Sequence, residues 1–230
     1  VSFVSCDDWL DKTPKDRLYP DVYFKTEDEL RLFTNQFYNN LVPSAADIYS
    51  ESSDLIVKSD LMLEMSGQRI IPDEGNGWNF TALRDINFYL QYSHNCTEVN
   101  ARNRYDGVAR FFRAYFYFEK VKRYGDIPWY DKALDSDDPE LYKARDSREF
   151  VMQKMLEDLD FAIANLPKTK NAYVLTRWTA LALKSRVCLF EGTFRKYHGL
   201  EDYEKYLNAC VSASETFMNE SGYTLYKSGS

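Results

Sequence analysis

The chain has few of the residues that most often carry out catalysis. Its 230 residues include only two histidines, His94 and His198, and neither lies near a serine or cysteine nucleophile motif. The nine glycines form no glycine-rich loop of the kind that binds phosphate groups. We therefore expect neither a recognised catalytic set nor a bound cofactor, and the chain is not predicted to be an enzyme.

Cysteine is also scarce, and its spacing excludes two further classes of site. Cys6, Cys96, Cys188 and Cys210 are far apart in the sequence, whereas zinc sites and dense disulfide frameworks show closely spaced cysteines. No metal site is therefore predicted. Cys188 and Cys210 lie among apolar neighbours and are interpreted as small buried side chains. Their spacing leaves open whether they form a disulfide bond.

Clusters of positive charge and long apolar runs are missing as well. The formal net charge is -7 and the isoelectric point is near 5.0, with no cluster of Lys and Arg to interrupt this balance. We therefore expect no binding to nucleic acid. No run of about 18 apolar residues is present, so no helix is expected to cross a membrane. Any membrane attachment must be covalent or made through a partner.

Apolar and aromatic side chains are plentiful. Hydrophobic residues make up 44% and aromatic residues 16% of the sequence, enough for one sizeable core in one or two domains. In several segments apolar residues recur at spacings of three and four, as in amphipathic helices, and strand signals are nearly absent. The predicted helices cover residues 26–42, 54–65 (a weaker pattern), 79–92, 98–124 and 147–166, with two more starting near 176 and after 199.

Local signals support this helical interpretation. Thr26 and Glu29 form a capping box, and Ser147 can cap the helix that follows it. The longest segment, residues 98–124, is apolar on more than one side, so we place it at the centre of the fold. Successive helices with small residues at possible contact faces predict an all-α array of antiparallel, tetratricopeptide-like (TPR-like) pairs with long loop insertions.

Residues 107–118 (GVARFFRAYFYF) followed by residues 124–129 (YGDIPW) resemble the signature of the SusD/RagB family of Bacteroidetes. The likeness extends to other stretches, namely residues 78–87, 158–167 and 177–197. The resemblance implies a non-catalytic lipoprotein on the surface of the outer membrane that captures oligosaccharides or polysaccharides. It also implies a partner, a SusC-like TonB-dependent transporter that takes up the glycan.

The amino end is similar to that of a surface lipoprotein. Residues 1–6 (VSFVSC) resemble the end of a lipobox, so Cys6 is predicted to carry the lipid, and Asp7 and Asp8 resemble an acidic surface-targeting tag. The alternative is an ordinary cysteine in a disordered end. Family members are usually much longer than this chain. The resemblance therefore implies a lipoprotein-like end and extended arm (residues 1–20) and a SusD-like helical domain (residues 21–230), truncated before the carboxy-terminal half.

A glycan site needs exposed aromatic rings, which stack on the CH faces of sugars, beside polar groups that bind hydroxyls. Asn76 and Trp78 lie in a loop with this composition, and Trp129 and Tyr130 provide a second candidate platform. These four residues are the predicted glycan contacts. Each has a structural alternative: a turn for Asn76, a core anchor for Trp78, and packing against the long helix for the other two.

Two groups of charged residues are assigned structural roles. Residues 135–138 (DSDD) carry carboxylates that calcium favours but lack the glycine of an EF-hand, so a solvated loop is preferred. Buried guanidinium groups usually stack on rings or pair with carboxylates such as Glu119 or Asp126. We assign this role to Arg110, Arg113 and Arg123.

Two other functions stay open at this point. A TPR-like protein-interaction scaffold would present a basic or asparagine-lined concave surface without an aromatic platform. An α-helical glycosidase would need two carboxylates at a suitable separation, which an acidic sequence does not exclude.

Overall fold

The computed structural model describes residues 22–42, 66–68, 70 and 77–225. Within these ranges the chain is helical, with no strand and one isolated bridge between Ile127 and Asp146. The α-helices are α1 (Glu27–Leu41), α3 (Thr81–Tyr92), α4 (Val99–Tyr124), α5 (Arg148–Asn165), α6 (Arg177–Tyr197) and α7 (Tyr203–Glu220). The all-α prediction is confirmed. The predicted arm over residues 1–20 and the weaker helix over residues 54–65 lie outside the described residues.

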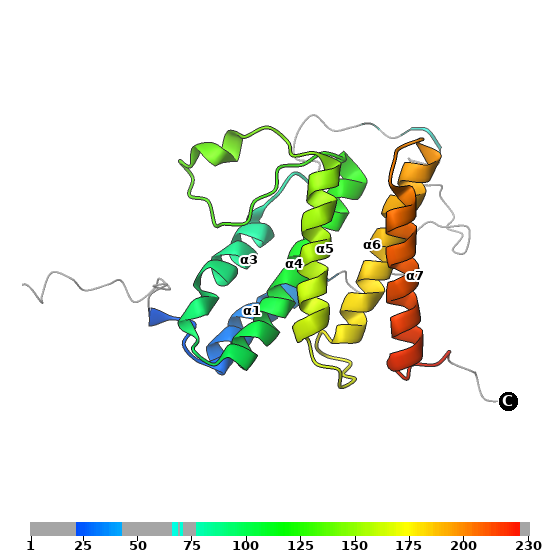
Figure 1. Ribbon diagram of the computed structural model, residues 1–230. Helices are drawn as coiled ribbons and strands as arrows, with labels where there is room; N and C mark the ends of the chain where they lie inside the picture. Colours follow the sequence, from blue (N-terminus) through cyan, green and yellow to red (C-terminus); the bar gives the residue numbers. More distant parts are fainter. Residues whose placement is uncertain (1–21, 43–65, 69, 71–76, 226–230) are drawn as a thin grey trace, which may run out of the picture.

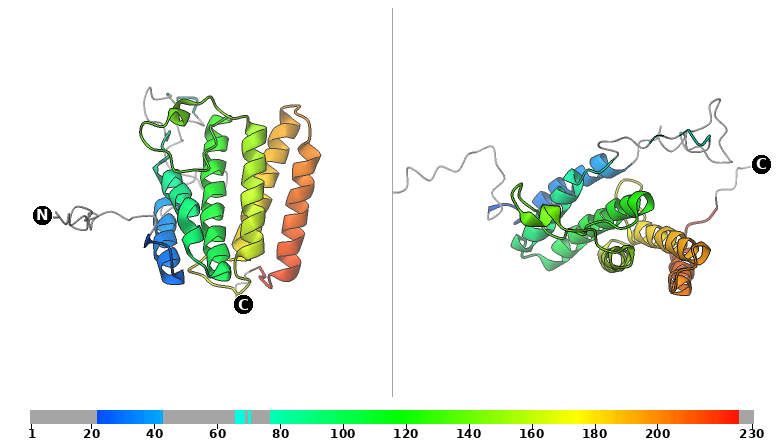
Figure 2. Two further views of the ribbon diagram at one scale, coloured as in Figure 1. Left: turned by 60° about the vertical axis from the view of Figure 1, so that its left-hand side comes forward. Right: turned by 90° about the horizontal axis from the view of Figure 1, so that it is seen from above.

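The helices lie side by side in a row that runs from α1 and α3 at one end to α7 at the other (Figure 1). Helix α4 packs against α5 and α6 packs against α7, each as an antiparallel pair (Figure 2). This is the TPR-like arrangement expected from the sequence. The connection between α4 and α5 extends over the α3 side of the row and carries the short 3-10 helix η4 (Pro139–Tyr142).

The helix starts follow the predicted capping signals. The Glu29 amide donates to Thr26 Oγ1 at 3.3 Å, and Glu29 Oε2 accepts from the Thr26 amide at 3.1 Å, which completes the capping box of α1. Ser147 Oγ accepts from the amide of Phe150 at 3.3 Å. These bonds satisfy amide groups that have no partner within the helix, so they set where each helix begins.

Helix α4 lies at the centre of the fold, as its apolar pattern predicts. It contacts α1, α3, α5 and α6, and Phe112 and Tyr117 are almost fully buried. The helix ends at Tyr124, and the next residue, Gly125, has a φ of 71°, in the left-handed region that glycine adopts most easily. The chain therefore turns sharply away from α4 at this point and begins the long connection.

The cysteines of the described residues are free. Cys188 is fully buried, as predicted, whereas Cys210 is only partly buried and lies 3.5 Å from the hydroxyl of Ser185. Burial raises the pKa of the Cys188 thiol to about 12. Cys188 thus behaves as a small core side chain. Cys6 lies outside the described residues.

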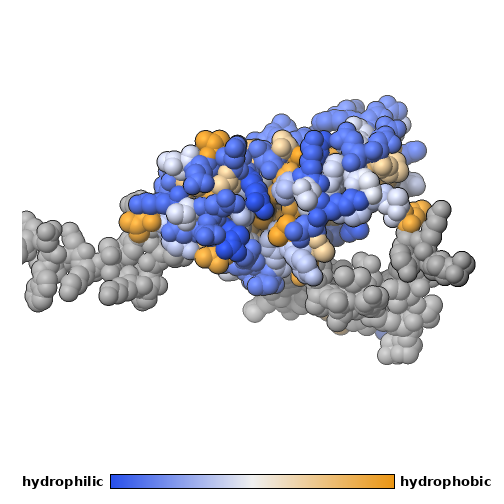
Figure 3. All heavy atoms as spheres, turned by 90° about the horizontal axis from the view of Figure 1, so that it is seen from below, coloured by the Kyte–Doolittle hydropathy of each residue, from blue (hydrophilic) through white to orange (hydrophobic). Residues whose placement is uncertain are grey.

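The surface seen from below is mostly hydrophilic, with apolar residues scattered among polar ones (Figure 3). Among the described residues, no helix has both the length and the apolar character needed to span a bilayer.

Candidate functional site

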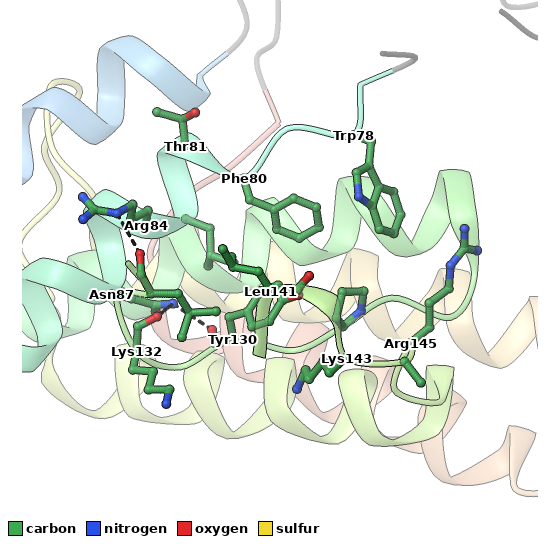
Figure 4. A pocket seen from close by; sticks show the side chains of 14 residues that line it. Trp78, Phe80, Thr81, Arg84, Asn87, Tyr130, Lys132, Leu141, Lys143 and Arg145 are labelled. Atoms are coloured by element: carbon green, nitrogen blue, oxygen red, sulfur yellow. Dashed lines mark hydrogen bonds between the residues drawn. The ribbon is translucent and has the colours of Figure 1, made fainter. Parts of the chain in front are cut away.

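A groove of about 510 Å³ lies between the start of α3 and the long connection that follows α4. Its floor is largely aromatic and aliphatic, and basic side chains stand at both ends (Figure 4). The residues that line it are Trp78, Phe80, Thr81, Leu83, Arg84, Asn87, Pro128, Tyr130, Lys132, Leu134, Leu141, Lys143, Ala144 and Arg145. This volume is in the range of sites that bind small ligands.

The connection is held against the helices by hydrogen bonds from buried side chains. The Tyr117 hydroxyl on α4 donates to the carbonyl of Pro128 at 3.2 Å and accepts from the amide of Tyr130 at 2.7 Å. Asn87 on α3 donates through Nδ2 to the carbonyls of Tyr130 at 2.8 Å and Lys132 at 3.2 Å. The far wall of the groove is thus tied to both α3 and α4.

A buried ionic group orients Asn87 in turn. Arg113 donates to Asp158 on α5 through Nε at 2.6 Å and Nη2 at 2.8 Å, and through Nη1 to Asn87 Oδ1 at 3.2 Å. Burial by itself lowers the pKa of Arg113, but the hydrogen bond and charge of Asp158 outweigh it, so the pKa is raised. The guanidinium therefore stays charged and connects α3, α4 and α5.

The structural role predicted for the arginines is confirmed for Arg113, although its partner is not one of the two carboxylates given as examples. Its carboxylate is Asp158 rather than Glu119 or Asp126. Arg110 also approaches Asp158, at 3.5 Å, and its guanidinium lies 4.2 Å from the ring centroid of Phe161. The pairing was missed because Asp158 lies 45 residues beyond Arg113 in the sequence.

Trp78 is a surface residue at the mouth of the groove, and its side chain is 41% exposed. The rings of Phe80 and Tyr124 lie edge-on to it, with centroid distances of 5.3 and 4.9 Å. The guanidinium of Arg145 lies 5.0 Å from its ring centroid. These contacts hold the indole in place without covering it, so the alternative of a buried core anchor does not apply.

Backbone contacts fix the chain just before Trp78. Lys120 Nζ donates to the carbonyl of Gly77. Gly77 has a φ of 79°, and a Cβ atom there would lie 3.2 Å from Arg123 Nη1. Both the conformation and the close approach favour glycine. Asn76, the other predicted contact in this loop, lies outside the described residues.

Trp129 and Tyr130, the second predicted platform, do not present exposed rings on which a sugar could stack. Trp129 is only 5% exposed, and its ring stacks on Tyr117 at a centroid distance of 4.3 Å while Arg113 lies 5.2 Å from the ring. Trp129 is therefore a core residue, which corrects the interpretation. Tyr130 is 8% exposed and forms part of the groove wall, where its hydroxyl donates to the carbonyl of Leu141 at 3.2 Å.

Asp135 and Asp138, in the acidic run of residues 135–138, pair with basic side chains around the groove. Asp135 lies 3.6 Å from Arg84, and Lys132 lies 3.7 Å from Asp138 and 2.9 Å from Glu140. Asp138 also caps η4 by accepting from the Glu140 amide at 2.9 Å. No group of three or more potential metal ligands occurs among the described residues. The run therefore acts as a partner for cations of the protein itself.

A second groove, of about 540 Å³, lies near the start of α4 and the end of α5. Amide side chains dominate its lining, and no aromatic residue of the described chain contributes to it. The polar residues are Asn100, Asn103, Arg104, Asn165, Thr169 and Asn171.

The sequence pattern pointed to Trp78 and Tyr130 but not to Phe80, Arg84 or Arg145, which complete the groove. Arg145 lies 67 positions after Trp78 in the numbering and meets it only because the long connection folds back over α3. No local spacing signals such an approach.

The comparisons with known proteins agree with the fold. The family SusD-like_2, described as "Starch-binding associating with outer membrane", matches residues 33–177, which is more than half of the chain. SusD-like protein P38 of Formosa agariphila is 23% identical over 203 residues, covering 81% of this chain and 39% of that protein. The chain thus spans about two-fifths of the length of the curated relatives it matches.

Two solved structures show the same fold. A SusD-like protein from Bacteroides fragilis aligns with 93% of this chain and 42% of its own, with a TM-score of 0.62 and 24% identity. A structure described as containing a xylogluco-oligosaccharide aligns with 64% of this chain and 29% of its own, with a TM-score of 0.53 and 22% identity. Given the match over residues 33–177 and the shared helical fold, this chain belongs to the SusD-like family.

Proposed function

We propose that this chain binds oligosaccharides in the groove beside Trp78 and performs no chemical step on them. The support is threefold: the family is described as starch-binding, a neighbour of the same fold is described with a xylogluco-oligosaccharide, and the chain presents an aromatic-floored groove of suitable size. Sugar binding of this kind combines aromatic stacking with hydrogen bonds to hydroxyls.

The observation that carries the proposal is the exposure of Trp78. Trp78 is 41% exposed at the mouth of a groove, so its ring offers a face on which a sugar can stack. The indole is held by Phe80 and Tyr124, so little conformational freedom is lost when a sugar ring docks on it. Phe80 also lines the groove and adds apolar surface beside the indole.

The lining of the groove supports binding without hydrolysis. Glycosidases of the common type use two carboxyl groups, one on each side of the scissile bond. No Asp or Glu of the described residues lines this groove. Incubation of the protein with the glycan it binds should therefore release no reducing sugar, and measurable release would contradict the proposal.

The direct test is isothermal titration calorimetry of the full chain against a panel of plant, host and microbial glycans. We expect binding of at least one glycan, and we expect Trp78→Ala to weaken it roughly tenfold because the stacking surface is lost. Tyr197→Ala is the matched control, since Tyr197 is 82% exposed on α6 and outside the groove. Equal binding by the Trp78 variant and the wild type would place the site elsewhere.

We further propose that the chain is part of a surface lipoprotein of the outer membrane, with residues 1–20 as the lipid-anchored arm and residues 21–230 as a SusD-like helical domain of a longer protein. Cys6 would carry the lipid, and a SusC-like TonB-dependent transporter would receive the glycan. Mass spectrometry of the protein from its native membrane tests the anchor: an unmodified Cys6 that retains residues 1–5 would rule it out. Co-purification with a TonB-dependent receptor tests the partner.

A protein-interaction role is the second candidate, favoured by the asparagine-lined groove near the start of α4. Amide side chains can bind the backbone of an extended peptide, and no described aromatic residue lines this surface. Paired Asn100→Ala and Asn103→Ala substitutions should leave glycan binding unchanged. They should weaken a transporter interaction only if the peptide of a partner occupies this groove.

A further inference from the structure

The described side chains that line the groove beside Trp78 differ in charge from the chain as a whole. The whole chain carries a formal net charge of -7. Among the described residues that line this groove, four are basic and none is acidic. The four are Arg84, Lys132, Lys143 and Arg145. A basic side chain that the protein does not itself neutralise attracts ligands of negative charge.

The basic groups stand at both ends of the apolar floor. Arg84 and Lys132 lie at the end formed by α3, while Arg145 lies beside Trp78 at the other end (Figure 4). A chain of several sugar rings laid along the floor would therefore meet a cation at each end.

The four cations differ in how far the protein itself neutralises them. Lys143 donates to the Trp129 carbonyl at 2.6 Å and pairs with Asp146 at 2.9 Å, so it serves the fold. Lys132 pairs with Glu140 at 2.9 Å. Arg84 lies 3.6 Å from Asp135 and donates through Nε to the Leu134 carbonyl at 3.1 Å. Arg145 is exposed and makes no hydrogen bond or ion pair with any other residue that the structure describes. Its five N–H donors are therefore available to a ligand.

The balance of hydrogen-bond donors and acceptors in the groove also favours a ligand with negative charge. A neutral sugar offers hydroxyl groups that donate as well as accept, so neutral-sugar sites usually supply carboxylate or amide oxygens. Among the described lining residues, Asn87 is the one amide, and it already accepts from Arg113 through Oδ1 and donates to two backbone carbonyls through Nδ2. The groove thus supplies mainly charged donors, which match a ligand that brings its own anionic acceptors.

We propose that the groove selects acidic oligosaccharides, in which a carboxylate of a uronic acid or a sulfate ester pairs with Arg145 while a sugar ring packs against Trp78. This proposal rests on the proposed function, because it names the class of glycan that the same groove takes. The bidentate geometry of a guanidinium suits both carboxylate and sulfate oxygens.

The experiment compares glycans that differ only in charge. Oligogalacturonate is titrated against its neutral methyl ester, and a sulfated galactan oligosaccharide is titrated against its desulfated form. We expect the acidic member of at least one pair to bind about tenfold more tightly at about 0.1 M salt. We expect the difference to shrink at about 1 M salt, where screening is stronger. Whichever pair shows the difference identifies the anionic group.

Variants connect the selectivity to Arg145. Arg145→Gln should weaken binding of the acidic glycan about fivefold and leave the neutral glycan unaffected, and Arg145→Lys should restore part of the difference. Arg31→Gln, an exposed arginine on α1 outside the groove, is the control and should change neither.

The outcomes separate this proposal from the general function. If neutral and acidic members of both pairs bind equally and Arg145→Gln weakens neither, acid selection is wrong while glycan binding stands. If Arg145→Gln weakens both members of a pair equally, the residue acts through packing on Trp78 and the proposal is again overturned. If no glycan binds, or if Trp78→Ala changes nothing, the proposed function itself fails.

Discussion

The two ends of the helical row are packed by side chains of very different size. At one end, aromatic rings fill the space between α1, α3 and α4, with centroid distances of 5.0 Å between Tyr38 and Phe112 and 6.1 Å between Phe37 and Phe112. At the other end, small residues separate α6 from α7: the hydroxyls of Ser185 and Ser214 lie 2.7 Å apart, and Ala213 is buried.

This difference accounts for where the groove lies. The distance between packed helices depends on the side chains at their contact, so rings hold helices apart and small residues let them approach. Trp78, Phe80 and Tyr130 add further rings at this side of the row, and they line the groove together with residues of the long connection. The tight α6–α7 pair leaves no comparable aromatic surface among the residues that line the grooves described above.

The largest expected effect comes from breaking the ionic group of the aromatic end. Asp158→Ala leaves the charge of Arg113 buried without its partner, which typically costs about 3–5 kcal/mol in the free energy of unfolding. Urea denaturation measures this loss. Asp160→Ala on the same helix is the control, because Asp160 is 58% exposed and its pair with Lys184 should contribute at most about 1 kcal/mol. Similar losses in both variants would mean that Asp158 has no special role.

The close packing of α6 against α7 can be disturbed by adding one methyl group. In Gly192→Ala the new Cβ would lie 2.7 Å from Leu207 Cδ2 and 3.2 Å from its backbone amide nitrogen. The Leu207 side chain or helix α7 must shift, and we expect a loss of about 1–3 kcal/mol in the free energy of unfolding.

Gly107→Ala is the matched comparison at a glycine of α4. There the new Cβ would lie 3.4 Å from Leu166 Cγ, an ordinary contact, so alanine should stabilise the helix by up to about 1 kcal/mol. A lower melting temperature for Gly192→Ala together with a higher one for Gly107→Ala would support the contrast between the two ends. A shift of the melting temperature in the same direction for both variants would show that the distance between the helices does not determine the effect.

The smallest effect concerns Asp106, which lies on α4 beside the aromatic end. Burial raises the pKa of this carboxyl group, so its ionised form is disfavoured in the folded protein. Its favourable contribution is complete below the unfolded pKa of about 3.9 and is lost as the pH rises through the folded pKa. Asp106→Asn should therefore raise the melting temperature at pH 7, with an advantage that fades toward pH 4. A gain that is independent of pH would assign the effect to packing instead.

Much of the fold could be predicted because its signals are local. The capping box at Thr26 and Glu29, the cap at Ser147 and the spacing of apolar residues act within one or two helical turns, and the helices start where these signals place them. The central position of α4 followed from the apolar residues on several of its sides.

The candidate site could be predicted only in part. Trp78 and Trp129 both stand beside glycine- or proline-containing loops, yet one is 41% and the other 5% exposed. The composition of the two loops does not show which tryptophan is exposed. The ring of Trp129 is buried because Tyr117 on helix α4 stacks on it, while Asp146, 17 positions later, fixes its backbone by accepting its amide at 2.7 Å.

By itself, then, the sequence determined an acidic, all-helical chain with an aromatic centre, since helix formation depends on neighbours three or four residues apart. Tertiary structure alone decided which aromatic ring meets solvent, which carboxylate neutralises Arg113, and that Arg145 stands beside Trp78. The reason is that these pairings join residues tens of positions apart, and only the packed arrangement of helices and the long connection brings them together.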